Sequence, residues 1–433
     1  MRRIYGPAVA AGTAGSMAAV FDAMFLGHTM GIKGLAALAV AVPILLFVNA
    51  FGIWVNSGVA SKVAMYYTNG EKKEASRVMV NNVIVNFLTS IVVCVFAYLV
   101  FIPVMHHSAT PYEIVQYSED YLRIFLLGVF FTYSSNGLYS ILRTIGHPKE
   151  SMSMQILVAA IHIILDVVFI FKLGLGVRGA ALATVLSQAM AWVLLILRFC
   201  IRRTDLQIRR SSFALDMEYI RFEFRFGSAP FYSDICAVLI AVHLNEALVN
   251  SSLEAASMYL ACYAIYRCLS EVFLRMLSGL TSSIIPLFVV NVSKKHYTRV
   301  KVILVKSIIL GSVIMSVGYL FLCSSPLVIA QMFNLDSEMK DICAVAIRIG
   351  LCTLPFLGGQ MVALSFFHSV EKKGLILGIN LSRQLLVLAP LLFILPYAYG
   401  PVGVWWSLCL TDIVSIVYSW YALLSEVRKL GVE

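Results

Sequence analysis

The sequence predicts an all-α integral membrane protein of twelve transmembrane helices, arranged as two six-helix bundles related by a pseudo-two-fold repeat. Three observations support this fold class. Hydrophobic residues make up 60% of the 433 residues and charged residues only 13%, whereas roughly a quarter of an ordinary soluble domain is charged. The apolar residues form long blocks, the basic residues gather in alternate loops, and short motifs of the first half recur in the second.

The apolar blocks are long enough to span a membrane. At 1.5 Å per residue, about 20 residues cross a hydrocarbon layer of roughly 30 Å. We expect helices because lipid leaves each segment to satisfy its own backbone polar groups. The predicted spans are 4–26, 35–60, 79–103, 119–142, 151–171, 178–200, 226–249, 255–290, 302–325, 341–368, 374–396 and 402–425.

A polar, basic stretch at the middle of the chain separates two predicted lobes. Residues 201–225 are predicted to be a cytoplasmic linker between an N-terminal six-helix lobe, 1–200, and a C-terminal six-helix lobe, 226–433. Most lysines and arginines between the spans fall in the loops on the same side as this linker. The positive-inside rule then places both termini in the cytoplasm of a multi-pass plasma (inner) membrane protein.

Short motifs recur at a nearly constant distance along the chain, which indicates duplication of a six-helix unit. The pairs are Arg77-Val78 with Arg299-Val300, Arg123-Ile124 with Arg348-Ile349, Lys149 with Lys373, and Gly176-x-x-Gly179 with Gly400-x-x-Gly403. Each match is weak by itself. Together they keep one order and fall at equivalent points of the helix pattern.

Several other classes of protein are excluded. The net charge of +10 is spread between apolar blocks and not gathered on a soluble patch, so we expect no nucleic-acid partner. The nine cysteines are scattered, without a CxxC pair, and are interpreted as buried apolar residues. Neither HExxH nor GxSxG is present, so an enzyme is not expected. The protein is expected to be a monomer embedded in the lipid bilayer.

Longer motifs resemble those of the multidrug and toxic compound extrusion (MATE) family. They are Asp22-x-x-x-x-Gly27, Leu142-Arg143-x-x-Gly146-x-Pro148-Lys149, Asp166-x-x-Phe169-Ile170-Phe171, Gly174-x-Gly176-x-x-Gly179-Ala180-Ala181, Arg383-Gln384 and Gly403-Val404-Trp405-Trp406-Ser407. The resemblance covers nearly the whole chain and is nearest to the DinF-like branch of the MOP flippase superfamily. It implies a V-shaped central cavity that opens alternately to each side, and export driven by an inward cation gradient.

Ionisable side chains within spans are costly and therefore indicate function. Asp22 and Asp166 are two of these in the first lobe. The resemblance assigns both to an ion-coupling site, with Asn136, His162 and Thr184 as partners. His162 and Asp166 lie four residues apart and so share one helix face. The structural alternative is a set of hydrogen-bonded polar residues within the bundle.

The histidine is a departure from the family, which usually has asparagine at this position. Imidazole nitrogen is a poor ligand for sodium, whereas imidazole titrates near neutral pH. We therefore favour H⁺ as the coupling ion at His162, with Na⁺ as the alternative, and we expect no cofactor. Apart from a sodium ion at these residues, no metal is expected.

The second lobe carries a different polar set, and two interpretations of it stay open. It is either a self-neutralising ladder along a helix or a polar wall of the substrate cavity. The family branch with a second-lobe ion site has acids about where Val238 and Gln360 stand here, so that site is in doubt. The candidate cavity residues are Asp234, Arg267, Glu271, Arg275, Gln360 and Arg383.

The resemblance and these residues lead to two hypotheses about transport. The first is an antiporter that exports small amphipathic, cationic organic compounds such as drugs or toxins in exchange for H⁺ or Na⁺. The second is a flippase or exporter of a lipid-linked saccharide or a related anionic lipid, since arginines suit a pyrophosphate head group.

Overall fold

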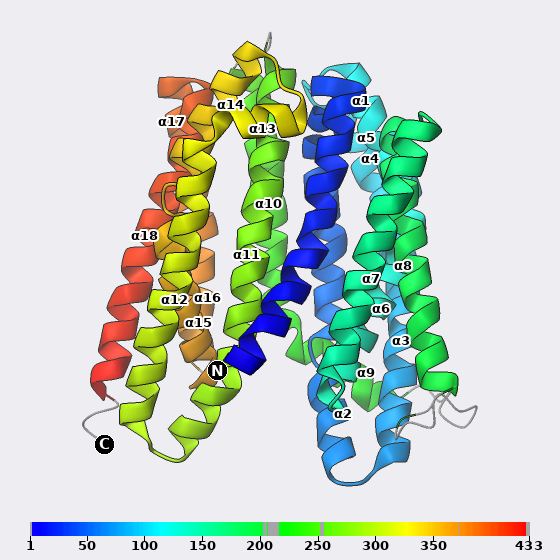
Figure 1. The fold of residues 1–433 in the computed structure, drawn as a ribbon, viewed down its shortest axis with the longest axis vertical. Helices are drawn as coiled ribbons and strands as arrows, with labels where there is room; N and C mark the ends of the chain where they lie inside the picture. Colours follow the sequence, from blue (N-terminus) through cyan, green and yellow to red (C-terminus); the bar gives the residue numbers. More distant parts are fainter. Residues whose placement is uncertain (1, 202–205, 207–215, 252–254, 371, 430–433) are drawn as a thin grey trace. The chain divides into compact units, whose positions relative to one another are not determined.

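The computed structural model describes residues 2–201, 206, 216–251, 255–370 and 372–429 (Figure 1). Over these residues the regular structure is entirely helical. The elements are α1 (Arg2–Asn56), α2 (Val59–Thr68), α3 (Lys72–Phe96), η1 (Ala97–Phe101), α4 (Ile102–Met105), α5 (Tyr112–Leu127), α6 (Val129–Thr144), α7 (Pro148–Asp166), η2 (Val167–Lys172), α8 (Gly176–Ile201), α9 (Met217–Phe226), α10 (Ser228–Ser251), α11 (Ala256–Ser293), α12 (Tyr297–Ser324), α13 (Pro326–Phe333), α14 (Ser337–Gly350), α15 (Leu354–Ser369), α16 (Lys373–Leu381), η4 (Ser382–Leu388), α17 (Ala389–Tyr399) and α18 (Pro401–Lys429). The segments named η are π-helical.

The helices are long and apolar enough to cross a membrane. By length and composition, eight helical runs of the described residues qualify, and up to ten if each of two bent pairs is one span. All twelve predicted spans fall on helices, with the first two sharing α1 and the eighth on α11. Large apolar side chains stay exposed along the spans, as expected of surfaces that face lipid.

The structure corrects the loop predicted between the first two spans. Residues 27–34 continue as helix, so α1 joins both spans, and within α1 only Gly31 has a non-helical backbone, with φ 61° and ψ −142°. A glycine adopts this positive φ without the clash that a Cβ would cause. The break between the spans is therefore a single-residue kink.

Bends and π-helical segments recur at matching points of the two halves, which supports the duplication. The predicted fourth and tenth spans are both bent pairs, α5 with α6 at 52° and α14 with α15 at 42°. The predicted fifth and eleventh spans both contain a π-helical segment, η2 and η4. A π-helical turn inside an α-helix often marks a functional position.

Contacts between Cα atoms divide the chain into two compact units. The N-terminal unit comprises Val40–Ser108 and Tyr112–Val238, and the C-terminal unit comprises Met1–Ala39, Ala109–Pro111 and Leu239–Glu433. These units differ from the predicted lobes in the placement of the first span and of the start of α10. The lobe boundaries at 200 and 226 stay a prediction, and much of the predicted linker lies outside the described residues.

Each unit has its own apolar core. In the N-terminal unit, buried side chains of α2, α3, α6, α7 and α8 pack together with Tyr219 of α9. In the C-terminal unit, α11, α12, α15, α16 and α18 supply the corresponding core. α12 packs along α15, and α14 and α15 pack against α18. These packed helices fix the polar side chains described next.

Candidate functional site

His162 and Asp166 lie one helical turn apart on α7, within the N-terminal unit. α7 begins with Pro148 at its first position and ends at Asp166, where η2 follows. The His162 side chain is 4% exposed and that of Asp166 is 0% exposed. The Nδ1 atom of His162 lies 3.2 Å from Oδ2 of Asp166. The predicted sharing of one helix face is confirmed.

Thr184 of α8 contacts the other side of the same imidazole. Its Oγ1 atom lies 3.1 Å from Nε2 of His162. The Thr184 hydroxyl donates to the carbonyl of Ala180 at 3.1 Å, so its oxygen is placed to accept from an Nε2–H group. We therefore assign a proton to Nε2, an assignment that follows from the hydrogen-bond partners.

This assignment determines what the His162–Asp166 contact requires. With Nε2 protonated, a neutral imidazole would turn the Nδ1 lone pair toward the Asp166 carboxylate. Two lone pairs at 3.2 Å repel unless a proton lies between them. A proton held by either the imidazole or the carboxyl group removes this repulsion, and such a proton can be exchanged. The arrangement of His162, Asp166 and Thr184, hereafter the histidine cluster, is chemically suited to proton exchange.

Asn136, Asp234 and Asp22 are three further acidic or amide residues predicted for the sites, and they lie on three different helices. Asn136 lies on α6 with an exposed side chain, and among the described residues it makes no hydrogen bond to the histidine cluster. Asp234 is half-buried on α10 and belongs to the N-terminal unit. Asp22 lies on α1 in the C-terminal unit. Its role in ion coupling stays a prediction.

The charged residues of α11 form a ladder. Glu271 lies 3.7 Å from Arg267 and 2.8 Å from Arg275, measured between the closest nitrogen and oxygen atoms. The ladder predicted from the spacing of four is thus present in the C-terminal unit. Because one carboxylate serves two guanidinium groups, the ladder retains a net positive charge.

Gln360 stands about where a second-lobe ion site would have an acid, and its side chain forms hydrogen bonds within the helix bundle. Its Nε2 atom donates to the hydroxyl groups of Ser415 at 2.6 Å and Ser419 at 3.1 Å. These bonds join α15 to α18. The buried amide is therefore occupied within the helix bundle.

Sequence reasoning missed Asp412, which is the ion partner of Arg383. The Nη2 atom of Arg383 lies 2.5 Å from Oδ1 of Asp412, and the Thr353 hydroxyl donates to Oδ2 at 3.0 Å. The Asp412 side chain is 8% exposed. An ionisable residue within the predicted span 402–425 was the available signal.

A second missed residue is Glu223 on α9. Its Oε2 atom accepts from the Gly58 backbone N–H at 3.1 Å, and Oε1 accepts from the Tyr219 hydroxyl at 2.5 Å. The Trp54 indole donates to the Phe224 carbonyl at 2.8 Å. These bonds dock α9 at the break between α1 and α2. Burial raises the pKa of Glu223 to about 7.

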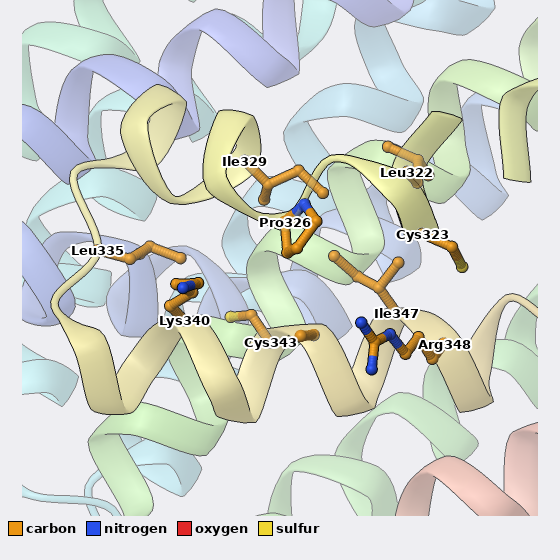
Figure 2. A pocket seen from close by; sticks show the side chains of 10 residues that line it. Leu322, Cys323, Pro326, Ile329, Leu335, Lys340, Cys343, Ile347 and Arg348 are labelled. Atoms are coloured by element: carbon orange, nitrogen blue, oxygen red, sulfur yellow. The ribbon is translucent and has the colours of Figure 1, made fainter. Parts of the chain in front are cut away.

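A small cavity lies beside α13 in the C-terminal unit (Figure 2). Its volume is about 10 Å³, and its lining is apolar except for Lys340 and Arg348 of α14. This volume holds about one water molecule. The cavity is therefore too small to be the binding site of an organic substrate.

The fold and these sites define a class of protein. Long apolar helices cross the membrane many times, and ionisable side chains lie buried within them, as in proteins that move ions or solutes across a bilayer. The molecule is a multi-pass membrane transport protein.

Comparison with known proteins identifies the family. The MatE family model matches residues 7–168 and 238–394. The chain belongs to the MatE family, whose members are transporters and not enzymes. The prediction of the family from its motifs is confirmed.

Curated relatives align over nearly the full length. The multidrug export protein MepA of Staphylococcus haemolyticus is 24% identical over 96% of this chain and 90% of its own. A FAD transporter of Shewanella oneidensis is 22% identical over 92% of this chain and 88% of its own.

Solved structures share the fold. The multidrug transporter DinF-BH, in complex with R6G, has a TM-score of 0.81 and 25% identity, covering 100% of this chain and 96% of its own. An inward-facing MATE family transporter of the MOP superfamily has a TM-score of 0.86 and 19% identity, covering 96% of this chain and 95% of its own. The predicted twelve-helix, two-lobe fold class is confirmed by these neighbours. Membership of the DinF-like branch stays a prediction.

Proposed function

We propose that this transporter exports small amphipathic organic compounds, mainly cationic ones, in exchange for protons by alternating access. The names of relatives such as multidrug export protein MepA support export of drugs. The protein acts as a monomer in the plasma membrane, with both termini in the cytoplasm and no cofactor. The basic loops support this orientation.

The histidine cluster is the observation that carries proton coupling. A proton shared between His162 and Asp166 stabilises two buried groups that would otherwise repel or stay charged at high cost. Coupling requires that this proton bind more tightly in one conformation than in the other. Asp22 and Asn136 are proposed to complete the ion site in the other steps of the cycle, and a sodium ion is the alternative occupant.

Reconstitution in liposomes tests the ion. Purified protein is given a pH gradient alone or a sodium gradient alone, and export of a fluorescent cationic dye is followed. The pH gradient should drive export and the sodium gradient at constant pH should not. Export under sodium alone, with no response to a pH gradient, would refute proton coupling.

Asp166→Asn tests the cluster in the same liposomes. The amide preserves shape and hydrogen bonding but cannot exchange a proton, so proton-driven export should be abolished while the protein stays folded. Thr184→Ser is the matched control, because it keeps the hydroxyl oxygen beside His162. Full proton-driven export by Asp166→Asn would contradict the assignment.

A second candidate function is the export or flipping of an anionic compound, including a lipid-linked saccharide. The net positive charge of the α11 ladder favours it, and one relative is named a FAD transporter. The cationic-dye assay separates the two functions. A dedicated anion or lipid transporter should leave dye accumulation unchanged.

A further inference from the structure

Arg383 is held in place by Asp412, which is in turn held by Thr353. It lies in the π-helical segment η4, next to Asp412 of α18. Thr353 fixes the other carboxylate oxygen of Asp412. Among the described residues, the guanidinium makes this one side-chain hydrogen bond, although it has five N–H groups. The ion pair is therefore firmly positioned. The guanidinium group keeps further N–H donors with which it can bind a ligand.

The side chain of Arg383 is partly accessible, although the residue lies within a membrane-spanning segment. Its side chain is 42% exposed, although its position is well inside the span Gly374–Tyr399. Tyr266 of α11 packs against Trp405 of α18, the helix that carries Asp412, with ring centroids 5.6 Å apart. A charged group at this depth must face the bundle interior or water, since contact with lipid is costly. The accessible part of Arg383 is thus expected to face the bundle interior or water and not lipid.

The charges of the α11 ladder and of the Arg383–Asp412 pair do not cancel. The α11 ladder and the ion pair together contain Arg267, Glu271, Arg275, Arg383 and Asp412. These five residues carry three positive charges and two negative charges. Arg267 follows Tyr266 directly on α11, so the ladder begins next to the contact between α11 and α18. An anionic group that binds beside Arg383 would neutralise the excess positive charge. It would also accept hydrogen bonds from guanidinium N–H groups whose direction is fixed.

We propose that Arg383, oriented by Asp412 and Thr353, is an anion subsite that binds a carboxylate or phosphate group of a transported organic solute. The proposal rests on the function proposed above and deepens it by naming a substrate group. A planar guanidinium matches a carboxylate or phosphate with two parallel hydrogen bonds. Asp412 acts as a positioning residue, which orients Arg383 and moderates its charge.

Two dyes that differ in one group test the subsite. Tetramethylrhodamine methyl ester is a cation, and its free acid has the same rings with an ionised carboxylate. Their binding to the purified full-length chain in nonionic detergent is followed by fluorescence polarisation. Arg383→Gln should weaken binding of the free acid about tenfold, which corresponds to about 1.4 kcal/mol. It should change binding of the ester less than about twofold, so the ester also reports correct folding.

Asp412→Asn gives the opposite sign and Arg348→Gln is the control. Removing the carboxylate leaves the full charge of Arg383 to the ligand, so the free acid should bind more tightly than to wild type. Arg348 lies on α14 in the same unit, and its loss should leave both dyes unaffected. A merely structural ion pair would give equal losses for both dyes in both variants of the pair.

The outcomes separate the failure of this inference from that of the proposed function. If wild type binds and exports the ester but Arg383→Gln binds the free acid as wild type does, the subsite is refuted and the exporter stands. If wild type binds neither dye, both proposals fail. If phosphatidylglycerol added to the detergent displaces the free acid only when Arg383 is present, the occupant is a lipid head group, which overturns the assignment to a solute.

Discussion

A single imidazole lies between two oxygens in the N-terminal unit, and we propose that it sets which ion the transporter uses. Thr184 fixes one nitrogen of His162, and Asp166 faces the other at 3.2 Å. Neutral imidazole offers nitrogen, which is a poor sodium ligand, whereas a carboxamide offers a hard carbonyl oxygen. We therefore expect the side chain at this one position to favour either proton or sodium coupling.

The first prediction concerns this position. His162→Asn should keep export but reduce its proton-driven rate by about tenfold, a typical coupling effect, while sodium gains influence. The pH optimum should move, because the titrating imidazole is gone. The measurement is dye export from liposomes under separate pH and sodium gradients. An unchanged ion dependence would show that His162 is a hydrogen-bonding residue only.

At the scale of elements, the repeated Gly-x-x-Gly motif does the same work in both units. Gly176 and Gly400 have positive φ angles of 53° and 59°, which L-residues rarely adopt. A Cβ on Gly179 would lie 3.1 Å from the Phe169 carbonyl oxygen, and one on Gly403 would lie 2.2 Å from that of Leu395. The motif therefore turns the chain and lets the next helix approach the last one closely.

The position of helix α9 depends on one carboxyl group, that of Glu223. Its N-terminus is capped by Asp216, which accepts from the backbone N–H groups of Glu218 and Tyr219. Its buried face is anchored by Glu223 at Gly58. Because Glu223 is more easily deprotonated in the undocked state, docking should respond to pH.

The sign of this response follows from the pKa of Glu223. Burial raises it from 4.5 to about 7, so the docked state binds more protons. Its stability is greatest below pH 4.5 and falls as the pH rises toward 7, by at most about 1.4 kcal/mol per pH unit. Hydrogen exchange of the α9 amides between pH 5 and 8 measures this change.

Glu223→Gln should remove the pH dependence, since the amide keeps an oxygen for Gly58 and does not titrate. Glu218→Gln is the control, because Glu218 is exposed on the same helix. If the pH dependence persists in Glu223→Gln and disappears in Glu218→Gln, then Glu218 causes it and the assignment to Glu223 is wrong.

For the whole molecule, the distribution of basic residues predicts an orientation in the membrane. Ser293, at the end of α11, should lie in the cytoplasm with the basic loop that follows it, and Ser108 should lie outside. In a cysteine-free background, cysteine at Ser108 should react with an impermeant thiol reagent in intact cells, and cysteine at Ser293 should not. Reversed labelling would invert the topology.

The sequence by itself determined the class of protein, the spans and the duplication. Long apolar runs decide membrane insertion locally, because transfer to lipid depends on each segment's own residues. Helical periodicity also predicted that His162 and Asp166 share a face, and it gave a ladder of Arg267, Glu271 and Arg275 as one of two interpretations. Local spacing was enough for these contacts, since each lies within one helix.

Only the tertiary structure decided which helices meet and at what rotation. It paired Arg383 with Asp412, and Glu223 with Gly58, across long distances in the sequence. It also placed Gln360 in a packing contact with α18. Hydrophobicity cannot select such partners, because lipid tails are as apolar as the helix surfaces. Close packing and interhelical hydrogen bonds select them, and these depend on the rotation and tilt of whole helices.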